Sequence, residues 1–141
     1  MTNQEAVDTI AQHLIAQNKR CVDVDDLERC LYRGPDGMKC AVGVLIPDSE
    51  YREEFDWFEF KGMSLQEIMD ECPSISSLNY KMLAELQYVH DSQGAWGSSG
   101  LTRDGAMKFI EAIEHVNKYC REEGEEHLRI PQCILDLHEN G

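Results

Sequence analysis

The chain has 141 residues, 42% of them apolar, which is enough for one folded domain with a hydrophobic core. Its 27 acidic and 13 basic residues give a formal net charge of −14, which argues against direct binding to nucleic acid or to an anionic membrane. We expect a mainly helical (α+β) fold: a single domain, residues 1–141, of about four helices around one short central β-hairpin.

The first predicted element is an amphipathic helix that ends near Asn18. Thr2 and Glu5 have the spacing of a capping box, in which each side chain bonds the backbone N–H of the other residue. Residues 21–28, CVDVDDLE, alternate apolar and acidic side chains at first, which leaves a strand and a helical turn open. The apolar residues of the helix recur at a spacing of three and four: Ala6, Val7, Ile10, Ala11, Leu14 and Ile15.

The sequence Gly34-Pro35-Asp36-Gly37 predicts a tight turn. Pro35 presets φ at the first central position, Asp36 tolerates the bridge region of φ/ψ space, and Gly37 can adopt a left-handed conformation. We expect this turn to close a β-hairpin in which Gly34 pairs with Met38.

This register places Arg33 opposite Lys39 and Tyr32 opposite Cys40. The apolar run that follows, residues 41–46, is too short for its pattern to separate a buried strand from a helical turn. We favour a short helix, whose small residues would let it lie close to the hairpin. Side-chain alternation along the two strands gathers the apolar residues on one face: Cys30, Tyr32, Cys40 and Val42.

Residues 47–60 are acidic and aromatic together, and no single period accounts for their pattern. One interpretation is an irregular lid whose aromatic side chains cover the core. The other is a partner-binding surface, because aromatic anchors with an acidic surround suit a basic, grooved protein. The candidate partner-binding residues are Glu53, Glu54, Asp56, Trp57, Phe58 and Glu59.

Three more helices are predicted in the second half of the chain. Ser64 and Glu67 form a second capping box, at the start of a helix that stops before Pro73. Apolar stripes at helical spacing predict the other two, over residues 77–90 and 102–123.

Two further segments in this half have other patterns. Residues 92–100 are rich in glycine and serine, which predicts a flexible loop with Trp96 as its anchor. Residues 125–141 form a tail with enough apolar side chains to dock on the core or on a second subunit, which would make a homodimer.

Two blocks of the sequence carry a family resemblance. The first, C-x-Y-R-x-P-D-G-x-K-C-A-V-G-x-L-I-P-D-x-x-Y, runs from Cys30 to Tyr51, and the second, L-x-x-L-Q-x-x-H-D, runs from Leu83 to Asp91. Both are similar to patterns in small acidic hypothetical proteins of tailed phages and prophages. The resemblance implies a phage origin and a fold, and it carries no catalytic residues.

The location of the chain and the state of its thiols follow from what the sequence contains. No apolar run approaches the ~20 residues that span a bilayer, and the N-terminus begins with polar residues instead of a leader. We therefore expect the cytoplasm of the host cell. The six cysteines are widely separated, so reduced thiols are favoured over a disulfide framework, with Cys30 and Cys40 buried.

Metal binding has one candidate in the sequence. Short ligand pairs such as C-x-x-C or H-x-x-x-H are missing, so we expect no structural metal and no cofactor. The pair His90-Asp91 invites comparison with metal-dependent phosphohydrolases, for which His13 and His115 are the only further histidine candidates. The alternative is a capping pair at a helix end, where the dipole favours histidine.

No motif for catalysis is present: the sequence lacks a G-x-S-x-G nucleophile elbow and a P-loop. We expect a non-catalytic protein that binds a protein partner with a basic surface, and that inhibits a host nucleic-acid-binding or defence protein by mimicking nucleic-acid charge. One alternative is an acidic surface that only keeps the chain soluble. The other is a small metal-dependent hydrolase that uses His90 and Asp91.

Overall fold

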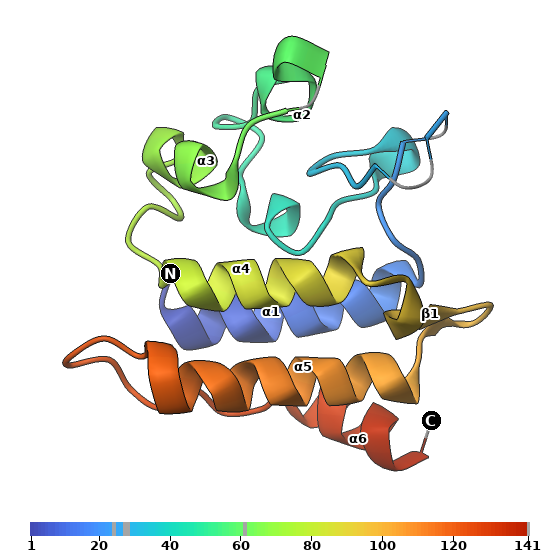
Figure 1. Cartoon of the computed structure of the whole chain (residues 1–141), viewed down its shortest axis with the longest axis vertical. Coiled ribbons are helices and arrows are strands. Elements are labelled where there is room, and N and C mark those ends of the chain that lie inside the picture. Colours follow the sequence, from blue (N-terminus) through green and yellow to red (C-terminus); the bar gives the residue numbers. More distant parts are fainter. Residues whose placement is uncertain (24, 27–28, 61, 141) are drawn as a thin grey trace.

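The structure, a computed structural model, describes residues 1–23, 25–26, 29–60 and 62–140 (Figure 1). The predicted class is confirmed, because the chain is mainly helical with one antiparallel strand pair among the described residues. The helices are α1 (Asn3–Gln17), α2 (Glu54–Trp57), α3 (Leu65–Glu71), α4 (Tyr80–Asp91), α5 (Arg103–His115) and α6 (Gln132–Asn140), and the strands are β1 (Trp96–Gly97) and β2 (Gly100–Leu101).

Helices α1, α4, α5 and α6 form one half of the molecule, which we call the helical layer. Helix α5 packs between α4 and α6, and α1 contacts α6 and β2 (Figure 1). The apolar stripe predicted for α1 faces inward, with five of its six residues buried and Ile15 packed against the core. Burial of such stripes is the main source of stability for helices of this length.

The capping boxes begin their helices where the sequence predicts. Glu5 N donates to Thr2 Oγ1 at 3.0 Å and Thr2 N donates to Glu5 Oε1 at 2.8 Å, and Ser64 and Glu67 exchange the same pair of bonds. Helix α4 begins later than predicted, because the side chain of Asn79 caps it by accepting a hydrogen bond from Met82 N. Helix α5 is followed by a π-helical turn, Val116–Cys120, so the α-helical part is shorter than expected.

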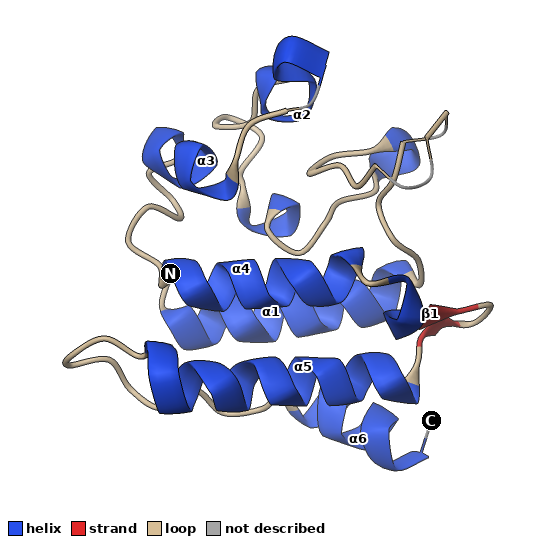
Figure 2. Cartoon of the chain, viewed as in Figure 1, coloured by secondary structure: helices blue, strands red, loops and turns tan. Residues whose placement is uncertain are grey.

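The described residues between 21 and 63 form the other half, which we call the hairpin region. Figure 2 shows that it consists mostly of loops and single helical turns. The predicted register is confirmed: Arg33 pairs with Lys39, Gly34 N donates to Met38 O at 2.9 Å, and Cys40 N donates to Tyr32 O at 3.2 Å. The pairing amounts to isolated β-bridges and is too short to form β-strands.

Two details of the hairpin turn differ from expectation. Pro35–Gly37 is a 3₁₀ turn, and Asp36 has φ of +58° instead of the bridge-region value. Aspartate tolerates the left-handed region, since its short polar side chain costs less there than a branched one. Gly37 also has positive φ, at +75°, so two successive left-handed residues reverse the chain.

The short helix predicted in residues 41–46 is a single 3₁₀ turn, Gly43–Leu45. It lies directly on the hairpin, because a Cβ built on Gly43 would be only 1.9 Å from the carbonyl oxygen of Tyr32. The turn also contacts α1, so it joins the hairpin region to the helical layer. Position 43 therefore has no room for a Cβ and requires glycine for this contact.

The antiparallel strands β1 and β2 lie where the sequence predicts a flexible loop. Trp96 pairs with Leu101 and Gly97 pairs with Gly100, at the edge of the fold and not at its centre (Figure 1). The pair is held by hydrogen bonds that composition does not reveal. Thr102 N donates to Ala95 O at 2.8 Å, and the indole of Trp96 donates to the carbonyl of His90 at 2.9 Å.

The C-terminal tail packs on the core of its own chain. Ile134 of α6 is fully buried, and Gln4 of α1 exchanges two hydrogen bonds with the backbone of Arg129. The six cysteines are free thiols. Cys40 is buried as predicted, but the prediction is wrong for Cys30, which is half-buried like Cys120 and Cys133. Among the described residues, no helix combines the length and the apolar character needed to cross a membrane.

Candidate protein-binding surface

Helix α2 and the 3₁₀ turn Phe58–Phe60 stand at the end of the molecule opposite α5 and α6 (Figure 1). Both Trp57 and Phe58 are 46% exposed, although large aromatic side chains are usually covered. Glu59 has φ of +51°, so the chain reverses immediately after the two aromatic residues and leaves them at the tip. We call the exposed residues here the acidic-aromatic surface: Glu53, Glu54, Trp57, Phe58 and Glu59.

The lid and partner-binding interpretations of this segment divide between different aromatic residues. Phe55 is fully buried and packs edge-to-face on Tyr51, with ring centroids 5.6 Å apart, so these two cover the core. Trp57 and Phe58 point away from it and remain half in solvent. Of these four aromatic residues, therefore, Trp57 and Phe58 are the ones that can be offered to a partner.

The prediction that Asp56 is a partner-binding residue is wrong. It is 3% exposed, and its carboxylate accepts hydrogen bonds from Tyr32 N at 2.7 Å, Arg33 N at 3.1 Å and the Tyr51 hydroxyl at 2.6 Å. Asp56 follows Phe55 on the inward side of a single helical turn, where it joins α2 to the hairpin. Burial, reinforced by the bond to Asp56, raises the pKa of Tyr51, so its hydroxyl remains a donor.

Arg29 belongs to this surface, although no pattern in the sequence points to it. Its guanidinium carbon lies 4.3 Å from the centroid of the Trp57 ring, and its Nη1 is 3.8 Å from a carboxylate oxygen of Asp23. Its Nη2 donates to the backbone carbonyl of Asp56. These contacts bring the acidic segment before the hairpin beside α2, two parts of the chain that the sequence presents as separate.

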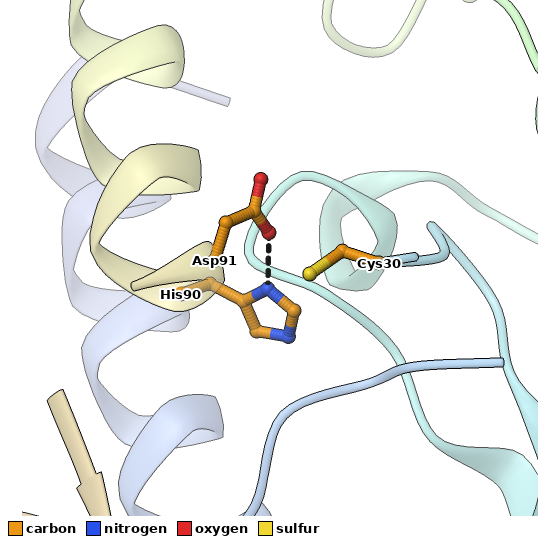
Figure 3. Close-up of side chains that lie close together, drawn as sticks. All are labelled: Cys30, His90 and Asp91. Carbon is orange, nitrogen blue, oxygen red and sulfur yellow. Dashed lines mark hydrogen bonds and ion pairs between the residues drawn. The ribbon is translucent and has the colours of Figure 1, made fainter. Parts of the chain in front are cut away.

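The predicted turn residues Gly34, Pro35, Asp36 and Gly37 lie in the hairpin turn and contribute no side chain to the acidic-aromatic surface as defined above. The other candidate site, His90 and Asp91, lies at the end of α4 (Figure 3). The structure adds Cys30 to it: one ligand atom from each of the three residues lies within 4.8 Å of the other two. Within the described residues this group does not extend to His13 or His115.

The hydrogen bonds of His90 argue against a metal in this group. Its Nε2 accepts from Cys21 N at 2.9 Å, so that nitrogen carries no proton, and Nδ1–H donates to Asp91 at 2.8 Å. A metal on Nδ1 requires the proton to move to Nε2, where it would meet the Cys21 N–H. Metal-bound histidines instead donate from their second nitrogen to an acceptor.

The thiol of Cys30 fits the same network of hydrogen bonds. Burial and the neighbouring Asp91 carboxylate raise the pKa of Cys30 to about 12, so it is a protonated thiol at neutral pH. Asp91 also accepts from Gln87 Nε2 at 2.9 Å. The carboxylate is therefore a shared acceptor, and Cys30 lacks the thiolate character of a nucleophile beside a histidine.

A scan against protein-family models gives no match for this chain, and searches of curated proteins and of solved structures give no significant match.

Proposed function

We propose that this chain is a non-catalytic binding protein whose acidic-aromatic surface docks on the basic surface of a protein partner. The observation that carries the proposal is the exposure of the consecutive residues Trp57 and Phe58 at the tip of the molecule, in a segment that also holds three exposed carboxylates. The partner class is a host nucleic-acid-binding or defence protein, which the chain inhibits by occupying its nucleic-acid site in the manner of a charge mimic.

The two kinds of side chain have different roles in such a complex. Exposed charge pairs contribute about 0 to 1 kcal/mol each and mainly speed association, so the glutamates steer the partner. Buried aromatic anchors carry most of the affinity, at about 2 kcal/mol or more each. A surface that served solubility alone needs the glutamates and has no use for the aromatic pair.

The test is capture from an extract of the bacterial host with three forms of the chain. One form replaces the aromatic anchors, Trp57→Ala with Phe58→Ala, and another neutralises Glu53, Glu54 and Glu59 to Gln. A matched control neutralises Glu122, Glu123 and Glu126, which are exposed at another place in the chain.

We expect a protein that the parent chain and the control both retain, that both surface variants lose, and that salt or added duplex DNA displaces. Equal capture by all forms contradicts the proposal. Capture that depends on the aromatic residues but not on salt or DNA would support a binding protein and contradict charge mimicry.

A metal-dependent hydrolase built on His90 and Asp91 is the second candidate, favoured by the proximity of Cys30. The bond from Cys21 N to His90 disfavours it, so we expect a metal chelator to leave the melting temperature unchanged. The measurement is thermal unfolding with and without chelator, alongside the metal content of the purified protein. Stoichiometric zinc together with a lower melting temperature in chelator would favour the hydrolase instead.

A further inference from the structure

The contacts of Arg29 define a small site on the acidic-aromatic surface. One face of Trp57, the carboxylate of Asp23 and the backbone carbonyl of Asp56 all meet the same guanidinium group. A π face, an anion and a neutral acceptor together complement a planar cation with several N–H donors. We call these three groups the guanidinium site.

We infer that the guanidinium site receives an arginine side chain of the protein partner, and that Arg29 occupies it in the free chain. The inference rests on the proposed function, since it names the partner group that the same surface recognises. The chain's own arginine shows which chemistry the site fits. On binding, the partner's arginine takes the place of Arg29.

Exchange at this site requires no change of the backbone. Arg29 is held in place by its own main chain: Asp23 N donates to Arg29 O and Arg29 N donates to Asp26 O, both at 2.9 Å. The adjacent bridge between Val22 and Cys30 closes this loop. The Arg29 side chain is 19% exposed, and its rotation out of the site leaves these backbone bonds in place.

The site is accessible from solvent even while it is filled. Trp57 remains 46% exposed with Arg29 against its ring, so an incoming side chain can reach the indole before Arg29 leaves. Both segments that meet at the site also carry exposed carboxylates, Asp25 and Asp26 before Arg29 and Glu53 and Glu54 before Trp57, and this negative charge favours an incoming cation.

The geometry selects arginine over lysine. A guanidinium can lie flat on the indole while its separate nitrogens reach the Asp23 carboxylate and the Asp56 carbonyl. The compact ammonium of lysine is a point charge that cannot make the three contacts in one plane. The expected ligand is an exposed arginine in a basic segment, of the kind that contacts phosphate in a nucleic-acid-binding protein.

The experiment uses the full chain and two labelled peptides of equal length, oligoarginine and oligolysine, with binding followed by fluorescence anisotropy. Arg29→Gln removes the resident side chain, and Arg103→Gln, at an exposed position in α5, is the control with the same change of charge. We expect Arg29→Gln to bind oligoarginine about fivefold more tightly than Arg103→Gln, a difference typical of one cation–π contact. Both variants should bind oligolysine equally.

Equal or weaker binding of oligoarginine by Arg29→Gln overturns the inference, since Arg29 is then no competitor. Arg29→Lys keeps the charge and the fold, and it should bind oligoarginine more tightly than the parent chain. If it does not, Arg29 does not exchange with an incoming arginine side chain. Trp57→Ala should abolish the preference for arginine while leaving oligolysine binding nearly unchanged.

The failure of the inference can be told from that of the proposed function. The variant with Glu53, Glu54 and Glu59 changed to Gln tests the surface as a whole. If it binds both peptides as tightly as the parent chain, the acidic-aromatic surface is not the binding surface and both ideas fail. If its binding weakens while Arg29→Gln and Arg103→Gln remain equal, only the guanidinium site is wrong.

Discussion

The helical layer and the hairpin region are held together by different means. In the helical layer, apolar stripes and capping residues close to each other in sequence determine where helices begin and which face is buried. In the hairpin region, single residues make contacts across many positions of the chain, such as Asp56 with Tyr32 and Gly43 with Tyr32. The contacts that hold the fold are therefore distributed over many residues in one half and concentrated in a few in the other.

The acidic-aromatic surface depends on this concentration. A four-residue helix such as α2 has no stability of its own, because nucleation is unfavourable and short helices are marginal in water. The buried Phe55 and the carboxylate of Asp56 fix it to the hairpin, and this leaves Trp57 and Phe58 free to point outward. The region that is harder to fold is thus the one that presents the proposed binding residues.

The largest effect is expected for Gly43→Ala. The added Cβ would lie 1.9 Å from the Tyr32 carbonyl oxygen and 2.9 Å from its carbon, so the backbone itself must separate. We expect the free energy of unfolding to fall by more than about 3 kcal/mol, measured by denaturant titration. Gly94→Ala is the control, since its nearest neighbour is 4.0 Å away, and it should change stability by less than about 0.5 kcal/mol.

The next effect, Asp56→Asn, tests the polar connection between α2 and the hairpin. The amide keeps one acceptor oxygen and puts N–H donors against groups that already donate: Tyr32 N, Arg33 N and the Tyr51 hydroxyl. Loss of these bonds should lower the free energy of unfolding by about 2 to 3 kcal/mol. Glu54 in the same helix is exposed, so Glu54→Gln is the control and should leave the free energy of unfolding nearly unchanged. A similar loss in both variants would mean that the negative charge of α2, and not the hydrogen bonds of Asp56, stabilises this helix.

What the sequence could predict follows the same division. Thr2 with Glu5 and Ser64 with Glu67 are local signals, and the register of Arg33 with Lys39 follows from one turn, so each could be found by spacing alone. The inward orientation of Asp56 could not, because a single helical turn has too few residues for a period.

Two other features also depend on contacts that no sequence pattern shows. Arg29 meets Trp57 across a long separation in the chain, and the strand pair β1–β2 depends on the bond between Thr102 and Ala95 and on the anchoring of Trp96. Composition correctly marked Trp96 as an anchor. It could not show that the glycines and serines around it form a paired turn.

A smaller effect separates steric from conformational requirements in the hairpin region. Gly37 has φ of +75° and open space where a Cβ would be added, so Gly37→Val meets no neighbour and costs only backbone strain. We expect a loss of about 1 to 2 kcal/mol in thermal or denaturant unfolding. Gly37→Asn tolerates this conformation better and should lose less; an equal loss would show that the side chain, not φ, is responsible.

The smallest effect concerns the contact between the two halves, where side chains of α1 and α4 bond the backbone of the hairpin region. His13 Nε2–H donates to the carbonyl of Lys39 at 2.8 Å, and Gln17 Nε2 donates to the same oxygen at 2.8 Å. Burial lowers the pKa of His13, and the bond to the Lys39 carbonyl opposes this shift. The folded chain therefore prefers neutral His13.

The direction of the pH effect follows from this preference. At neutral pH both folded and unfolded chains have neutral His13, and its titration does not affect stability. As the pH falls through about 6.5, the unfolded chain takes up a proton before the folded chain does, so the free energy of unfolding decreases. His13→Gln should remove this part of the decrease between about pH 7 and pH 5, while Gln17 continues to satisfy the Lys39 carbonyl. The measurement is denaturant unfolding of both proteins at the two pH values. An equal decrease in the free energy of unfolding for both proteins would show that His13 does not contribute to the pH dependence.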